Sequence, residues 1–111
     1  MTERQWTITV SIGRNIGPHK PMSDVNWEWF RSAVDHALRD RGVTVFFAGT
    51  GTGEYEGVRE ESATWVGATS IRPNVVLEAD LGRIAELWHQ DSIAVTYGET
   101  VLVGPDGRTE V

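Results

Sequence analysis

Cysteine is absent from this 111-residue chain. Disulfide bonds, thiolate nucleophiles and cysteine-based metal sites are therefore excluded. No apolar run is long enough to span a bilayer, and residues 1–6 lack the basic-then-apolar pattern of an export signal. We therefore expect a cytoplasmic protein with no membrane partner.

Basic residues are also scarce. Ten Lys and Arg stand against sixteen Asp and Glu, for a net charge of −6. Such a balance lacks the electrostatic footprint of a nucleic-acid binder and the polybasic signal for anionic membranes. The three histidines have no metal-site spacing, and no Gly-x-Ser-x-Gly elbow occurs. We expect no metal and no cofactor, and favour a non-enzymatic role while leaving an enzyme open.

Glycine gathers in one segment, Gly49–Gly57, which lacks the Gly-Lys-Ser/Thr ending of a P-loop. Its glycines do not fit dinucleotide-binding spacing either, so we interpret it as a flexible hairpin connection. Elsewhere the composition is that of an ordered protein, with 40% hydrophobic residues and five Trp. The chain predicts one domain over residues 1–111, with a core at about 6–103 and a frayed tail at 104–111.

The hydrophobic period switches between two and 3.6 residues along the chain, which predicts strands and helices in the order β-α-β-β-α-β. This order is typical of an α+β, ferredoxin-like fold, a four-stranded antiparallel sheet with two helices on one face. The predicted strands are Trp6–Ile12, Val43–Phe47, about Arg59–Ile71, and Ile93–Val103, and the predicted helices are Asp24–Arg41 and about Leu77–Gln90.

Cap residues support both helices. Ser23 is placed to cap the first helix, and Asn74 or Asp80 the second. In the first helix, Trp29 lies outside the predicted buried stripe, so we expect its side chain to contact something other than the core that this helix covers. That stripe consists of Trp27, Phe30, Val34, Ala37 and Leu38.

The sheet face away from the helices carries small, uncharged residues, including Ala94 and either Trp65 or Thr64. A solvated face usually carries more Lys and Glu, so we predict a homodimer through this face. A shallow ligand cavity, or a solvated face rich in strand-forming Thr, remains as an alternative. The candidate interface residues are Thr7, Thr9, Ser11, Trp29, Trp65 and Thr96.

Several short patterns in order resemble the bacterial family called domain of unknown function 3574, across about residues 7–103. The chain departs from it at Tyr55 and Asp91, where the family tends to have Trp and Glu. Many relatives look exported, whereas this chain shows no export signal. The patterns are Ile12-Gly13-Arg14-Asn15, Met22-Ser23 with Trp27 and Phe30, Gly42–Val45, Gly53-Glu54-Tyr55, Gly57 with Glu60 and Ser62, and Gln90–Ile93.

The resemblance implies no activity, but it singles out Arg14, Asn15, Glu60 and Ser62. In a ferredoxin-like sheet the first and third strands are antiparallel neighbours, so these residues are predicted to lie close together. We predict an Arg14–Glu60 ion pair. Because Glu60 and Glu61 point to opposite faces, one of them is expected to turn inward.

The leading functional hypothesis is a binding module for a small ligand, an anion among the options, or for a protein. Arg14 and Asn15 would supply polar contacts, and Trp29, Tyr55 and Trp65 apolar area. The alternatives are a dimeric α/β-barrel enzyme acting on an aromatic or carbonyl compound, and a phage-type inhibitor of a host protein. The candidate ligand-binding residues are Arg14, Asn15, His19, Tyr55, Glu60 and Ser62.

Overall fold

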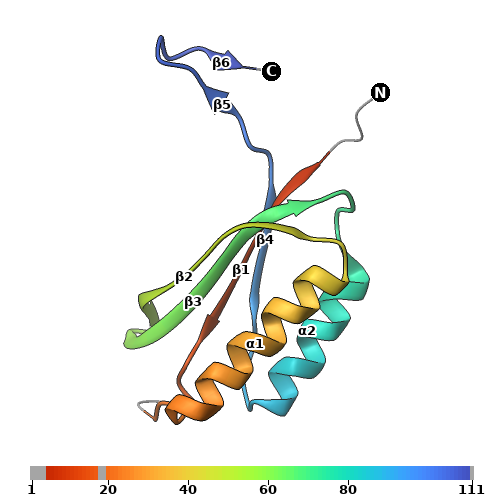
Figure 1. The fold of residues 1–111 in the computed structure, drawn as a ribbon. Helices are drawn as coiled ribbons and strands as arrows, with labels where there is room; N and C mark the ends of the chain where they lie inside the picture. Colours follow the sequence, from red (N-terminus) through yellow and green to blue (C-terminus); the bar gives the residue numbers. More distant parts are fainter. Residues whose placement is uncertain (1–4, 18–19, 111) are drawn as a thin grey trace.

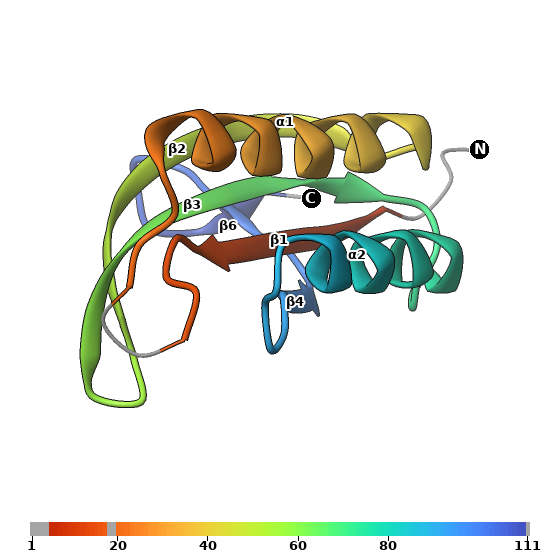
Figure 2. The same ribbon diagram turned by 90° about the horizontal axis from the view of Figure 1, so that it is seen from below.

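A computed structural model describes residues 5–17 and 20–110 of the chain. Its main sheet has four strands in the order β2-β3-β1-β4, every neighbouring pair antiparallel. Both helices lie against one face of this sheet (Figures 1 and 2). The predicted ferredoxin-like fold is thus confirmed. The elements are β1 Trp6–Gly13, α1 Asp24–Asp40, β2 Thr44–Tyr55, β3 Val58–Thr69, α2 Val75–Leu87 and β4 Ala94–Gly98.

The hydrophobic core lies between the helices and the covered face of the sheet. Alternation along β1 buries Ile8, Val10 and Ile12 on this face. Opposite Val10 stands Trp65 of β3, which is 5% exposed and donates a hydrogen bond from Nε1 to Asp35 Oδ1 at 3.1 Å. The prediction that Trp65 is an interface residue on the open face is therefore wrong. Thr64 holds that position, because a pleated strand alternates its side chains between the two faces.

Both helices begin as the cap residues predict. The Ser23 side chain accepts a hydrogen bond from the Asn26 amide, and the Asn74 side chain accepts one from the Leu77 amide. Asn74, and not Asp80, therefore caps α2. All five residues of the stripe predicted in α1 are buried. Neither helix in the described part of the chain is long and apolar enough to cross a membrane.

The predicted Gly-rich loop is wrong, because β2 continues through it to Tyr55 and the turn consists of Glu56 and Gly57. The glycines recur every second residue, and each faces a residue of β3 on the open face of the sheet. Pairing with β3 therefore holds this glycine-rich segment in a regular strand conformation. The pairs are Gly49 with Thr64, Gly51 with Ser62, and Gly53 with Glu60.

A β-bulge between Val45 and Phe47 shifts the register of β2. Beyond it Phe47 pairs with Val66 on the open face, and its side chain lies against Gly49, where an added Cβ would be 2.9 Å from Phe47 Cζ. Phe47 is 62% exposed. The open face therefore carries a large aromatic ring in addition to its small residues.

The C-terminal segment differs from the predicted long last strand and frayed tail. β4 stops at Gly98 because its partner, Thr7, is already at the beginning of β1. The chain then forms a hairpin in which β5 (Leu102–Val103) pairs with β6 (Thr109–Glu110). Hydrogen bonds from the Gly104 amide to the Arg108 carbonyl and from the Gly107 amide to the Gly104 carbonyl close its turn.

Candidate functional site

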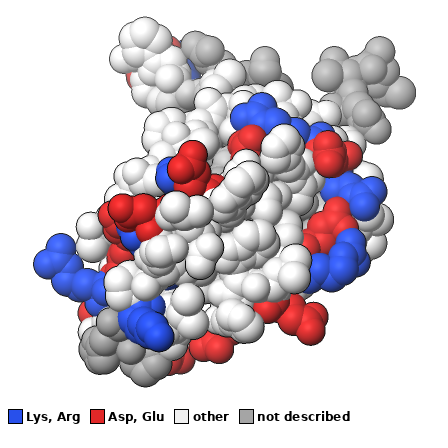
Figure 3. Space-filling model, turned by 60° about the horizontal axis from the view of Figure 1, so that its bottom comes forward, with Lys and Arg blue, Asp and Glu red and all other residues white. Residues whose placement is uncertain are grey.

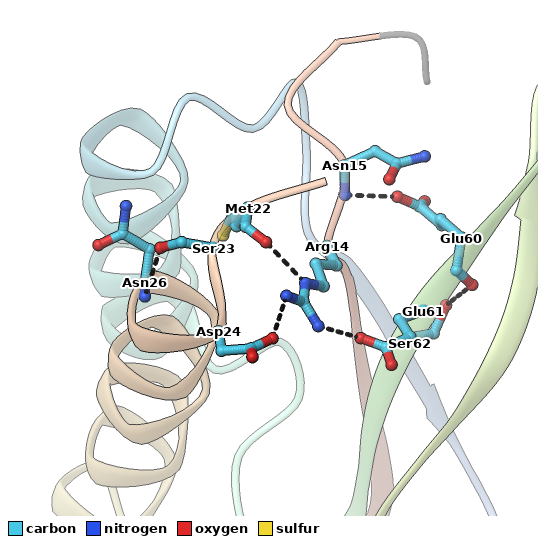
Figure 4. A network of polar contacts seen from close by, with 9 residues as sticks. All are labelled: Arg14, Asn15, Met22, Ser23, Asp24, Asn26, Glu60, Glu61 and Ser62. Carbon is cyan, nitrogen blue, oxygen red and sulfur yellow. Dashed lines mark hydrogen bonds and ion pairs between the residues drawn. The ribbon is translucent and has the colours of Figure 1, made fainter. Parts of the chain in front are cut away.

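Arg14, just after β1, is held by three groups (Figure 4). Its guanidinium donates to Glu61 Oε2 at 2.5 Å, to Asp24 Oδ1 at 2.6 Å and to the Met22 carbonyl at 2.8 Å. Hydrogen bonds to Glu61 and then Asp24 raise the pKa of Arg14. The residue therefore ties β1 to β3 and to the start of α1, and its charge is already matched by two carboxylates.

The predicted Arg14–Glu60 ion pair is wrong. Gly13 pairs with Ser62, so Arg14 comes level with Glu61, and Glu60 lies on the opposite face. There the Glu60 carboxylate accepts a hydrogen bond from the Asn15 amide at 2.9 Å (Figure 4). The four residues singled out by the sequence are neighbours, but strand alternation gives the two glutamates separate partners.

Two glycines, Gly13 and Gly53, make room for the side chains of Glu60 and Ser62 on the open face of the sheet. A Cβ at Gly13 would overlap the Glu60 carboxylate, and a Cβ at Gly53 would lie 2.7 Å from Ser62 Oγ. The Glu60 carboxylate therefore lies directly over the backbone of Gly13, and the Ser62 hydroxyl lies over the backbone of Gly53. At these positions glycine serves close approach, because an ordinary residue would push the polar groups away.

A hollow of about 410 Å³ opens at this end of the open face. Its walls are the end of β1, the β2–β3 hairpin and residues 89–92 after α2. The Gln90 side chain joins two of these walls by donating to the Asn15 carbonyl at 3.0 Å. His89, at φ 55°, turns the chain here in a conformation that is uncommon outside glycine. A hollow of this size is sufficient for a small molecule.

The lining of this hollow is negatively charged. Four acidic residues, Glu54, Glu56, Glu60 and Asp91, are among the residues that line it, together with the basic residue His89. In the described part of the chain no Lys or Arg forms an ion pair with any of these four acids. Glu60 is half-buried. An unpaired carboxylate in such a place favours a cationic ligand and disfavours an anionic one.

Of the predicted ligand-binding residues, Asn15, Glu60 and Ser62 line the hollow. His19 lies outside the described residues, as does the side chain of Tyr55. Sequence reasoning did not select Gly13, Gly53 or residues 89–91 as ligand-binding residues, although Gly13, Gly53, Gln90 and Asp91 belong to the patterns of the family resemblance. The alternating glycines of β2 were an available signal, because a period of two indicates a strand with one bare face.

The predicted interface residues divide between the two sides of the sheet. Thr7, Thr9 and Ser11 pair in register with Gly98, Thr96 and Ala94 on the open face, as predicted. Trp29 lies on α1, 64% exposed, and belongs to the helix layer. Trp29 and Trp65 are therefore not part of the open face.

A second hollow, of about 760 Å³, lies between α2 and β4 and includes Tyr97. The Tyr97 hydroxyl donates to Glu78 Oε2 at 2.5 Å and accepts from the Asn74 amide at 2.9 Å. Burial, followed by the hydrogen bond to Glu78, raises the pKa of Tyr97 to about 12. The phenol stays protonated at neutral pH and braces the start of α2, which argues against a role as a general base.

Charge elsewhere is mixed. On the face shown in Figure 3, acidic and basic side chains are intermingled around an uncharged band. Surface ion pairs such as Arg39–Asp35 and Arg41–Asp80 are examples of local compensation. In the described part of the chain no group of three or more His, Asp or Glu side chains is arranged to hold a metal ion.

Comparison with known proteins finds no matching family model and no matching curated protein. Among solved structures, a phage SAM lyase in complex with S-methyl-5'-thioadenosine is similar, with 16% identity and a TM-score of 0.54. That match covers 96% of this chain and 85% of the lyase. An unknown protein from Galdieria sulphuraria matches at 16% identity and a TM-score of 0.51, over 88% of this chain and 50% of that protein.

At this identity the two likenesses show a shared fold. The chain is thus a small protein of α/β composition whose fold also occurs in a phage protein. The chain spans only half the length of the Galdieria protein. Membership of the domain-of-unknown-function family 3574 stays a prediction.

Proposed function

We propose that this protein binds a small organic cation in the hollow at the end of the open face. Glu60 would provide the counter-charge, and Asn15, Ser62 and Gln90 would provide hydrogen-bonding groups. The observation that carries the proposal is the half-buried Glu60 carboxylate, which has no basic partner in the described part of the chain. The anionic ligand considered from the sequence has less support, because Arg14 is engaged by two acids.

Electrostatics favours a cation here. The hollow has acidic residues in its lining, and a bound positive charge would be attracted to them. Charge-assisted hydrogen bonds to a carboxylate are also stronger than neutral ones. The Asn15 amide holds Glu60 in place, so little side-chain freedom would be lost on binding.

The first ligand to test is S-adenosylmethionine, a sulfonium cation. The reason is the similar phage protein, which is a SAM lyase observed with S-methyl-5'-thioadenosine. S-adenosylhomocysteine is the matched neutral-sulfur control, because it differs by the methyl group that gives the sulfur its charge. If charge drives recognition, the sulfonium should bind more tightly than the thioether.

Isothermal titration calorimetry tests the proposal. We expect S-adenosylmethionine to bind, and Glu60→Gln to weaken it by about tenfold or more, the usual loss for a hydrogen bond to a charged group. Glu61→Gln is the matched control, since its side chain contacts Arg14 on the other face. Absence of binding by S-adenosylmethionine and by simple ammonium ligands, or equal affinity in Glu60→Gln, would contradict the proposal.

A second candidate function is catalysis in the same hollow, favoured by the likeness of fold to a lyase. Incubation with S-adenosylmethionine followed by mass spectrometry separates the two. Recovery of intact ligand supports a binding module, whereas release of S-methyl-5'-thioadenosine, lost in Glu60→Gln, supports an enzyme.

The phage-inhibitor hypothesis draws its support from the phage source of the similar lyase. Affinity capture of a partner from a host lysate tests it.

A further inference from the structure

In the described part of the chain, the C-terminal hairpin is not packed against the main sheet or the helices. Figure 1 shows it standing clear of the sheet and helices. We call residues 100–110 the arm. Its base is attached by a hydrogen bond between the Thr100 and Thr7 hydroxyls, and beyond that point β5 and β6 pair with each other. An isolated two-stranded hairpin is marginally stable in water, so the arm calls for a surface to pack on.

The arm carries an apolar run with nothing over it. Val101, Leu102 and Val103 are each more than 60% exposed. Three adjacent apolar residues this exposed, on a projecting hairpin, are typical of an interaction surface. The arm points away from the body of its own chain, so the natural partner surface belongs to another molecule.

The same chain offers a matching surface on its open face. The row of Thr96, Thr9, Val66 and Phe47 crosses all four strands and is uncharged. Phe47 leaves 62% of its surface exposed at one end of this row. Like charges oppose contact between two copies of a chain with net charge −6, so an uncharged face is where two copies can meet.

We propose that the arm of one copy packs on the open face of a second copy, with Leu102 against Phe47. In a symmetric dimer the contact is made twice, because each copy contributes one arm and one face. The row around Phe47 is distinct from the hollow lined by Glu60, so this contact does not depend on the cation-binding proposal.

Light scattering after size exclusion gives the first test. We expect a mass of twice the 12.3 kDa chain. Leu102→Glu and Phe47→Lys should each raise the dimer dissociation constant by about tenfold or more, as loss of a central contact does. Leu87→Glu, at a 70% exposed position on α2, is the control and should leave the dimer intact.

Mixing the two variants distinguishes this contact from a simple face-to-face dimer. Leu102→Glu and Phe47→Lys should together form a heterodimer, with one native contact and one Glu–Lys pair. Circular dichroism melting confirms that each variant is folded, and Thr9→Lys replaces Phe47→Lys if that variant melts early. A monomeric wild type, a dimer insensitive to Leu102→Glu, or no heterodimer on mixing would overturn the proposal.

Discussion

Along β1 the side chains of Ile8, Val10 and Ile12 are at most 3% exposed, whereas Thr7, Thr9 and Ser11 between them face away from the helices. The covered face is packed and apolar, and it determines the register of the sheet. The open face carries the hollow and an uncharged row of residues. The two faces of one sheet therefore have different tasks.

Glu60 and Glu61 repeat this contrast at the scale of two adjacent residues. Glu61 faces Arg14 and is paired, whereas Glu60 accepts from the Asn15 amide and has no basic partner in the described part of the chain. A glutamate thus has a structural role on the covered face, at position 61, whereas the glutamate at position 60 lines the candidate binding site on the open face.

Truncation should cost far more on the covered face. Ile8→Ala should lower the free energy of unfolding by about 2–5 kcal/mol, because Ile8 is 1% exposed and leaves a cavity. Thr9→Ala, the next residue, should change it by no more than about 1 kcal/mol, because Thr9 is on the open face and the main loss is the weaker strand propensity of Ala. Urea unfolding at neutral pH measures both. Equal losses in the two variants would refute the division between the faces.

Adding a methyl group should also destabilise the covered face more than the open face. Gly67→Ala should lower the free energy of unfolding by about 1–3 kcal/mol, because its Cβ would overlap the Thr44 carbonyl and lie 3.0 Å from Val43 Cγ1. Gly51→Ala, with nothing within 4 Å of its Cβ, should be neutral or stabilise by up to about 1 kcal/mol. Thermal melting gives the order of stability, and a less stable Gly51→Ala would contradict it.

Tyr97, on the covered side of the sheet, should make the free energy of unfolding depend on pH. Tyr97→Phe should cost about 1 kcal/mol at neutral pH through lost hydrogen bonds. Since the folded-state pKa is raised from 10.0 to about 12, the phenol's contribution is complete below pH 10 and is lost as the pH rises through 12. In that window the unfolded chain binds fewer protons, so stability falls with pH.

Urea unfolding from pH 8 to pH 12 tests this. The wild type should lose stability more steeply than Tyr97→Phe above pH 10, so that the two curves converge. Parallel curves across this range would show that Tyr97 does not hold its proton more tightly in the folded protein.

The smallest effects on stability are expected at the two glutamates. Glu61→Gln should lower the melting temperature by no more than a few degrees, because Arg14 keeps its contact with Asp24. Glu60→Gln should leave the melting temperature unchanged or raise it, since it removes an unpaired negative charge from the hollow. High salt should shrink both differences. A larger loss in Glu60→Gln would indicate that Glu60 has a structural role.

Much of the fold could be predicted because its signals are local. The hydrophobic period, the caps at Ser23 and Asn74, and the buried stripe of α1 all depend on residues a few positions apart. The Gly-rich part of β2 was missed because glycine usually indicates a turn, and only pairing with β3 makes it a strand. The neighbourhood of Arg14, Asn15, Glu60 and Ser62 followed from the order of the strands.

Local pattern thus specified the elements, their order and the end of the sheet where polar residues gather. Tertiary structure decided which glutamate Arg14 binds and whether Trp65 or Thr64 faces outward, because a shift of one residue exchanges the faces of a strand. It also brought Gln90 to Asn15, 75 residues apart. Such contacts arise only when the whole sheet and both helices have packed, so no short stretch of the chain encodes them.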